Sequence, residues 1–271
     1  MKILLNIDEL NKAINSSSNL GFVPTMGSLH MGHVSLIKKS KIRCKRTLVS
    51  IFVNPNQFNK KKDYLVYPRN KSKDLKILKR LNVDYVFLPT AKQIYNNKRL
   101  KKITLRKKEK ILCAKYRKGH FEGVLDVMDR LIKIIKPKLI FMGEKDYQQI
   151  ILIKNFIKNK YKSKIISCPT IRDKNKVALS SRNSLLNKNS LNSVGLIAKE
   201  LIKFKSALLN IYTKKLPILN YKKQELKEKF NIKIDYLELR NENDLKMSGI
   251  NKKKRLFIAY HVNKVRLIDN F

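Results

Sequence analysis

The chain has 271 residues, of which 43% are hydrophobic, so it is long enough to build one large domain or two modest ones. No apolar run approaches the roughly 18 residues of a membrane span, and the first residues turn acidic too early for a secretory signal. The sequence therefore predicts a cytoplasmic protein that does not act at a membrane. Its 62 Lys and Arg against 20 Asp and Glu give a formal net charge of +42. The lysines are spread along the whole chain among many Asn and Ile, which indicates an AT-rich coding bias and no specific nucleic-acid partner.

Short β-rich segments alternate with helical patterns through roughly the first 170 residues. In chain order the predicted strands are 20–24, 47–53, 84–88, 139–143 and 164–169, and the predicted helices are 33–43, 72–82, 123–136 and 146–160. Strands that alternate with helices predict a parallel sheet, in which ligands bind beyond the carboxyl ends of the strands. We expect an α/β fold whose Rossmann-like nucleotide-binding domain covers residues 1–168.

The pattern changes after residue 168. A long helix is predicted over 189–210, and a lysine-rich segment follows it. Strands are then predicted at 234–239, 256–261 and 264–268, with a tight bend at 261–263 between the last two. We expect residues 169–271 to form a smaller C-terminal α+β domain that acts as a lid on the first.

The most informative segment is 24–33, which reads PTMGSLHMGH between a predicted strand and a predicted helix. His30 and His33 are three residues apart, so they lie on one face of a helix, beside the backbone N–H groups and the positive dipole end that favour an anion. Gly32 has no Cβ, so a nucleotide can approach the backbone there. The alternative is a pair of histidines that only caps and packs a helix start.

Three further segments carry polar side chains. Residues 50–58, SIFVNPNQF, include Gln57, whose amide both donates and accepts and suits a hydroxyl and a carboxylate. Residues 143–149, GEKDYQQ, include Lys145, a mobile charge for phosphates, and Asp146, which either caps a helix or orients a ligand or a Mg²⁺-bound water. Residues 178–183, ALSSRN, offer hydroxyls and a guanidinium to phosphates, or else cap a helix.

Five motifs occur together: PTMGxLHxGH at 24–33, SIFVNPxQF at 50–58, GHFxGV at 119–124, GEKDYQQ at 143–149 and LSSRN at 179–183. In this order and spacing the chain resembles the pantothenate synthetase (pantoate–β-alanine ligase) family of the nucleotidylyl-transferase superfamily. The resemblance implies an ATP-dependent ligase that joins (R)-pantoate to β-alanine. It implies a pantoyl-adenylate intermediate, release of pyrophosphate and AMP, a requirement for Mg²⁺, and a homodimer.

The resemblance also implies roles for individual residues. His33 would be the proton donor and, with His30 and Lys145, would make up the catalytic set. Ile171 would contact adenine through its backbone, and Gln57 and Gln149 would hold pantoate, Gln57 also serving β-alanine. The implied ATP-binding residues are Met26, Gly27, Ser28, Leu29, His30, Met31, Gly32, His33, Gly143, Glu144, Lys145, Asp146, Ile171, Leu179, Ser180, Ser181 and Arg182. The metal ligands are unknown, although Asp63, in a loop over 59–67 expected to close on the site, is a candidate.

Two departures and two rival readings accompany this resemblance. Met31 stands where the family is often acidic, and residues 173–177 lack the glycine that usually precedes the LSSRN motif, which puts nucleotide affinity in doubt. One rival is a class I aminoacyl-tRNA synthetase, because residues 246–249 read KMSG, although 271 residues leave no room for an anticodon-binding domain. The other is a nonenzymatic RNA-binding protein, which four intact ligand clusters argue against.

Overall fold

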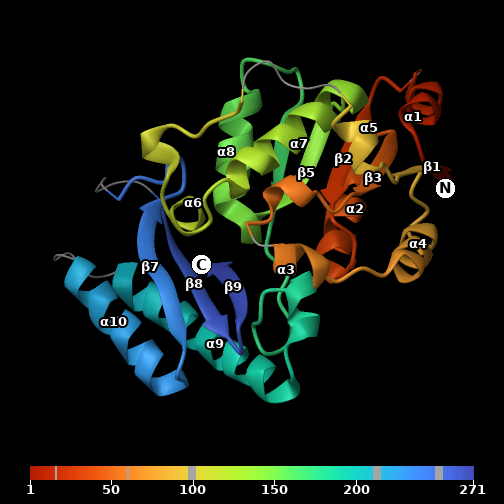
Figure 1. Cartoon of the computed structure of the whole chain (residues 1–271). Coiled ribbons are helices and arrows are strands. Elements are labelled where there is room, and N and C mark those ends of the chain that lie inside the picture. Colours follow the sequence, from red (N-terminus) through yellow and green to blue (C-terminus); the bar gives the residue numbers. More distant parts are fainter. Residues whose placement is uncertain (16, 60, 97–101, 210–214, 248–252) are drawn as a thin grey trace. The chain divides into compact units, whose positions relative to one another are not determined.

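A computed structural model of the chain describes all residues except 16, 60, 97–101, 210–214 and 248–252 (Figure 1). The chain divides into two compact units. The first contains Met1–Glu144 and Gln149–Pro169, and the second contains Lys145–Gln148 and Thr170–Phe271. Among the described residues, none of the helices has both the length and the apolar character needed to span a bilayer.

The first unit is built on a parallel sheet. Its strands are β1 (Lys2–Leu4), β2 (Leu20–Thr25), β3 (Arg46–Ile51), β4 (Tyr85–Phe87), β5 (Leu139–Gly143) and β6 (Lys164–Cys168). They pair in the order β1-β4-β3-β2-β5-β6, and each pairing is parallel. The chain proceeds from β2 to β3 and β4 on one side and places β5 and β6 on the other, so the order reverses between β2 and β5. Ligands of open α/β sheets bind at such a reversal. The predicted Rossmann-like sheet is confirmed, with one strand more than predicted, β1.

Helices pack around this sheet. The longer ones are α1 (Ile7–Ile14), α2 (Met31–Arg43), α4 (Lys71–Arg80), α7 (His120–Ile135) and α8 (Tyr147–Ile157). The short ones are α3 (Lys61–Leu65), α5 (Ala91–Ile94), α6 (Cys113–Tyr116) and the 3-10 turns η1 (Pro55–Gln57), η2 (Lys107–Glu109) and η3 (Glu144–Asp146). α2 packs on β2, β3 and β5, and α7 packs on α1, α5 and η1. Ile37 from α2 and Val23, Val49, Val86 and Phe141 from four strands are fully buried together, so the core lies directly behind the carboxyl ends of the central strands.

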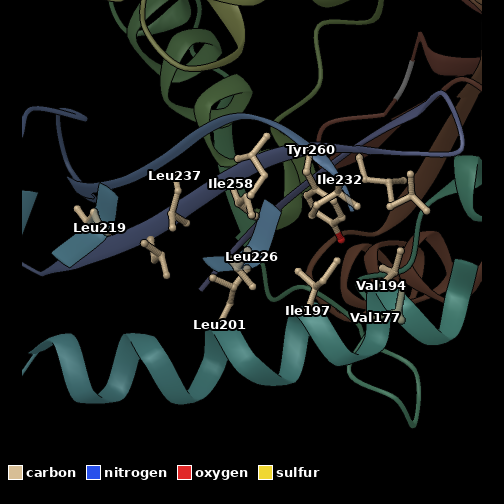
Figure 2. Packing of buried hydrophobic residues seen from close by; sticks show 14 of the residues in the cluster. Val177, Val194, Ile197, Leu201, Leu219, Leu226, Ile232, Leu237, Ile258 and Tyr260 are labelled. Atoms are coloured by element: carbon tan, nitrogen blue, oxygen red, sulfur yellow. The ribbon is translucent and has the colours of Figure 1, made fainter. Parts of the chain in front are cut away.

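The second unit is the predicted small α+β fold. Strands β7 (Lys233–Asn241), β8 (Lys254–Val262) and β9 (Val265–Asn270) form an antiparallel sheet, accompanied by α9 (Lys188–Leu209) and α10 (Lys215–Phe230). A short turn, η4 (Ser181–Leu185), precedes α9. Figure 2 shows α9 running along the sheet, with Val194, Ile197 and Leu201 directed toward it. Residue 210, the predicted end of α9, is outside the described residues.

In this unit one helix was not predicted, and one predicted bend was wrong in detail. The lysine-rich segment after α9 is helical: α10 buries Leu219 and Leu226, seven residues apart, on one face, together with Lys222, which donates to Glu200. The bend predicted at 261–263 is at Asn263 and Lys264, whose φ angles are 46° and 67°. His261 and Val262 still belong to β8, because Val262 pairs with Val265. Two successive positive φ angles are those of the tight hairpin turn that matches strand twist.

Candidate functional site

The turn that follows β2 is held by a distant carboxylate. Gly27 and Ser28 have φ angles of 79° and 52°, in the left-handed region. Asp74 of α4, which is 1% exposed, accepts hydrogen bonds from the backbone N–H of Ser28 at 2.8 Å and of Leu29 at 2.7 Å. A Cβ on Gly27 would lie 3.0 Å from Asp74 Oδ2. Asp74 was not predicted from the sequence, because nothing in its own neighbourhood indicates a contact 46 residues away.

The two histidines build the start of α2. His30 is the N-cap, and its Nδ1 accepts from Gly32 N at 3.1 Å, while His33 Nδ1 accepts from His30 N at 3.2 Å. The two ring centroids are 4.1 Å apart. Because each Nδ1 accepts from a backbone N–H, a neutral ring carries its hydrogen on Nε2. Both histidines therefore cap the start of α2, and in this tautomer both Nε2–H groups are donors of the kind that bind phosphate.

Gly32 has an intramolecular reason for its missing side chain. A Cβ there would lie 2.8 Å from His30 Cε1 and 2.9 Å from His30 Nδ1. Glycine therefore makes room for the capping imidazole. Met31, by contrast, is 61% exposed and contributes nothing to the core.

Gln57 is the last residue of η1, which follows β3 after residues 52–54, and it is 9% exposed. Its Oε1 accepts from Asn54 Nδ2 at 3.3 Å, and its Nε2 donates to the sulfur of Met26 at 2.6 Å. The structure therefore brings together two residues predicted from separate motifs. The carbonyl of Gln57 is bonded to His120 Nδ1 at 2.7 Å, which anchors η1 to the start of α7.

The GHFxGV motif supports this turn. A Cβ on Gly123 would lie 2.2 Å from the carbonyl oxygen of Asn56, so only glycine lets α7 pack against η1. Asn54 Nδ2 donates to the Gly123 carbonyl at 3.1 Å. The motif was recognised in the sequence, but no role was predicted for Asn54, His120 or Gly123. These residues could be found in the sequence motifs, but the contacts that they make could be seen only in the folded structure.

In the second unit, Lys145 is held through its backbone. Its carbonyl accepts from Asn270 Nδ2 at 2.9 Å, and Asn270 Oδ1 accepts from Arg255 Nη1 at 2.7 Å. The Arg255 guanidinium also stacks on the Tyr147 ring, 4.1 Å from its centroid. The Lys145 ammonium lies 3.8 Å from Asp146 Oδ1, within reach of an ion pair. The strand β9 therefore fixes the segment that carries Lys145, while Asp146 serves as its ionic partner.

A small hairpin joins Ile171 to the LSSRN motif. Leu179 N donates to Ile171 O at 2.9 Å, and Ser180 Oγ accepts from Arg182 N at 3.2 Å as the cap of η4. Ser180 therefore caps η4, as one of the two interpretations of this motif predicted. The structure therefore places the predicted residue Ile171 beside Leu179, and Leu179 leads directly into the turn that contains Ser180 and Arg182.

A buried ion pair holds this hairpin. The Arg172 guanidinium donates to both oxygens of Asp269, at 2.7 and 2.8 Å, and to the carbonyl of Lys176 at 2.9 Å. Asp269 is 7% exposed. Lys176 has a φ of 70°, and it occupies the segment in which the sequence lacks a glycine. The turn is closed instead by Asp173 Oδ1, which accepts from Asn175 N and Val177 N.

The remaining predicted site residues lie at the following places in the structure. Gln149 lies in α8 of the first unit, Gly143 ends β5, and a Cβ on Gly143 would meet nothing within 4 Å. Across the described parts of the chain, no group of three or more His, Cys, Asp or Glu side chains is arranged to hold a metal ion. Asp63 is exposed on α3. Residues 248 and 249 of the KMSG segment are outside the described residues, so that resemblance gains no structural support.

Comparisons with known proteins extend over the whole chain. The family model described as pantoate-beta-alanine ligase matches residues 2–271. Pantothenate synthetases of Francisella tularensis subsp. novicida and Pseudothermotoga lettingae are 39% and 38% identical, covering all of this chain and 97% and 98% of those proteins.

Solved structures agree with this match. A pantoate-beta-alanine ligase from Francisella tularensis, complexed with beta-gamma ATP and beta-alanine, is 38% identical with a TM-score of 0.85, covering 100% of this chain and 97% of that one. Pantothenate synthetase from Thermus thermophilus is 27% identical with a TM-score of 0.87, covering 100% and 99%.

Proposed function

This chain belongs to the pantoate–β-alanine ligase family, and from that premise we propose that it joins (R)-pantoate to β-alanine through a pantoyl-adenylate intermediate. It is an ATP-binding ligase of pantothenate biosynthesis. The observation that carries the proposal is the His30–His33 turn at the carboxyl end of β2, where the strand order reverses. The Francisella tularensis relative complexed with beta-gamma ATP and beta-alanine supports ATP and β-alanine as substrates. We further propose that the protein is a cytoplasmic homodimer.

In the first step, a carboxylate oxygen of pantoate attacks the α-phosphorus of ATP, and the bond to the bridging oxygen breaks to release pyrophosphate. The protein supplies positioning and charge stabilisation, and no covalent nucleophile is needed. We assign the Nε2–H groups of His30 and His33 to the phosphate oxygens, with His33 as the proton donor. Lys145, Ser180, Ser181 and Arg182 hold phosphates, and the backbone of Ile171 contacts adenine.

In the second step, the amine of β-alanine attacks the acyl carbon of the adenylate, and AMP leaves. Gln57 and Gln149 hold pantoate, and Gln57 also contacts β-alanine. When bound, Mg²⁺ would help to neutralise the charge that develops on the phosphates.

The direct test measures pyrophosphate release from ATP and Mg²⁺ with and without pantoate, followed by AMP and pantothenate formation after β-alanine is added. We expect pyrophosphate to depend on pantoate and pantothenate to depend on β-alanine. If pantoate produces no pyrophosphate while an amino acid supports ATP–pyrophosphate exchange, the proposal is wrong. The class I aminoacyl-tRNA synthetase alternative is then favoured. RNA binding that falls with salt, without ATP turnover, would favour the nonenzymatic alternative.

A substitution tests the assignment of Gln149. Gln149→Ala is expected to raise the KM for pantoate about tenfold and the KM for ATP less than twofold, because only pantoate loses an amide contact. Steady-state kinetics with each substrate varied in turn gives both constants. An equal rise in the two KM values would remove the substrate-specific role.

A further inference from the structure

The amide of Asn54 has only one possible orientation. It is 1% exposed, and its Oδ1 accepts from the backbone N–H of Asn56 at 3.1 Å. Its Nδ2 donates to the backbone carbonyl of Gly123, also at 3.1 Å. Because a backbone N–H only donates and a carbonyl only accepts, these two contacts identify which end of the amide is oxygen and which is nitrogen.

The orientation of Asn54 decides the orientation of Gln57. Asn54 Nδ2 also donates to one side-chain atom of Gln57, at 3.3 Å, and that atom must therefore be Oε1. Gln57 Nε2 is then directed at the sulfur of Met26, 2.6 Å away. A thioether sulfur is a weak acceptor, so an oxygen of a bound substrate would replace it as the partner of Nε2. Gln57 is thus oriented to donate, whereas its amide was expected to donate and accept alike.

Tyr95, which follows α5, completes this chain of contacts. Its hydroxyl donates to Asn54 Oδ1 at 2.7 Å. The guanidinium of Arg130 lies 4.8 Å from the centre of the Tyr95 ring, and Arg130 Nη1 donates to the carbonyl of Ile94 at 3.1 Å, so the ring is held from one side. Burial is the main reason that the pKa of Tyr95 is raised to about 12, with the nearby Asp126 adding to it. The hydroxyl therefore stays protonated and able to donate at neutral pH.

We propose that Tyr95 is a positioning residue for substrate recognition: together with the backbone of Asn56 and Gly123, its hydroxyl holds the Asn54 amide, which in turn directs Gln57 Nε2 toward an oxygen of the substrate. The substrate oxygen is of the carboxylate or hydroxyl class, since both accept from an amide. This inference rests on the proposed function, in which Gln57 holds pantoate. It assigns to Tyr95 a role in substrate affinity that acts through Asn54 and Gln57.

Tyr95→Phe removes only the hydroxyl oxygen and tests this role. The KM for pantoate is expected to rise about fivefold, with the KM for ATP and kcat each within twofold of the parent, because one oriented hydrogen bond is weakened. Tyr221→Phe is the matched control, since the Tyr221 side chain is 75% exposed, and it is expected to change none of these constants. Thermal unfolding of both variants checks that the fold is retained.

A double-mutant cycle separates positioning from general structure. In a Gln57→Ala background, Tyr95→Phe is expected to change the KM for pantoate by less than twofold, because the group it positions is gone. A fivefold rise that persists in that background would overturn the inference, as would an unchanged KM in the single variant. Parent protein without pantoate-dependent pyrophosphate release would instead refute the proposed function, so the two failures are distinct.

Gln57→Glu tests the donor role directly. The substitution keeps the shape and the oxygen that faces Asn54, but it replaces the Nε2–H donor with an acceptor. We expect the KM for pantoate to rise at least as much as it does in Gln57→Ala. Retained pantoate affinity in Gln57→Glu would show that Gln57 does not recognise substrate by donating, and the inference would be wrong.

Discussion

The turn after β2 and the hairpin over residues 171–179 are both proposed to contact ATP, but they are held in different ways. In the first, His30 and His33 cap the helix with Nδ1, so the same side chains build the backbone and present Nε2. In the second, Arg172 and Asp269 fix the hairpin and are separate from the assigned phosphate ligands. Substitutions in the first unit should therefore mix structural and chemical effects, whereas in the second unit the two should be separable.

The largest effect is expected from His33→Asn. Asparagine can place its side-chain oxygen near the position of Nδ1 and keep the hydrogen bond from His30 N, but it has nothing in the place of Nε2. Pantoate-dependent pyrophosphate release should fall at least about 100-fold, with the melting temperature little changed. His33→Ala should lose the cap as well, so it should be equally inactive and less stable. Activity within a few-fold of the parent in either variant would contradict the assignment of His33.

Asp74→Asn should have the next largest effect. One of the two backbone N–H groups of Ser28 and Leu29 would face an NH₂ group, which cannot accept. We expect the free energy of unfolding to fall by about 2 kcal/mol and kcat/KM for ATP to fall about tenfold or more, because the turn carrying the histidines is disturbed. Denaturant unfolding and steady-state kinetics measure the two quantities. The exposed Asp8→Asn is the control, and an equal loss in that variant would point to a general charge effect.

Arg172→Lys should separate stability from catalysis. Lysine lacks the planar guanidinium fork that matches both oxygens of the buried Asp269 while also reaching the Lys176 carbonyl, so the free energy of unfolding is expected to fall by about 3 kcal/mol. The kcat of the folded fraction should fall only a few-fold, because no assigned ligand is removed. Arg46→Lys, at an exposed ion pair with Asp84, should leave the unfolding transition almost unchanged. A large loss of kcat without a loss of stability in Arg172→Lys would break the contrast between the two units.

The smallest effect is expected at Lys176. A non-glycine residue at a φ of 70° is strained by about 1–2 kcal/mol, and glycine would relieve this at an entropic cost of about 0.5–1 kcal/mol in the unfolded chain. Lys176→Gly should therefore stabilise the protein by about 0.5 kcal/mol, measured by denaturant unfolding. The KM for ATP should stay within about twofold, because Asp173 already closes the turn. A large fall in that KM would show that the missing glycine does limit nucleotide affinity.

The sheet and its central strands could be predicted from the sequence because apolar runs flanked by polar turns recur through the first unit. The strand β5 was predicted with both of its ends, and the small α+β fold of the second unit was also predicted. The helix α10 was missed because its many lysines hide a narrow buried face marked by Leu219 and Leu226. The local pattern of apolar residues therefore predicted a helix or strand correctly where most of its side chains are buried.

The supporting contacts of the site could not be predicted, because they join residues far apart in the chain. Asp74 is 46 positions from Ser28, and Tyr95 is 41 positions from Asn54. The absence of a glycine before the LSSRN motif was visible in the sequence. The positive φ of Lys176 could be seen only in the backbone of the structure. The roles of the assigned ATP-contacting and pantoate-contacting residues stay predictions until the variants are measured.

The hydrogen bond from Asn270 to the carbonyl of Lys145 joins positions 125 apart. Loop-closure entropy rises by about 0.6 kcal/mol for each doubling of length, so closing this loop costs only about 2 kcal/mol more than closing one of about twelve residues. The penalty therefore falls mainly on kinetics, since contacts of long sequence separation form late in folding. In pulsed hydrogen exchange during refolding, the amides of residues 145–148 should gain protection after those of β2 and β3. During that interval the sheet of the first unit would be formed, but the enzyme would not yet be active.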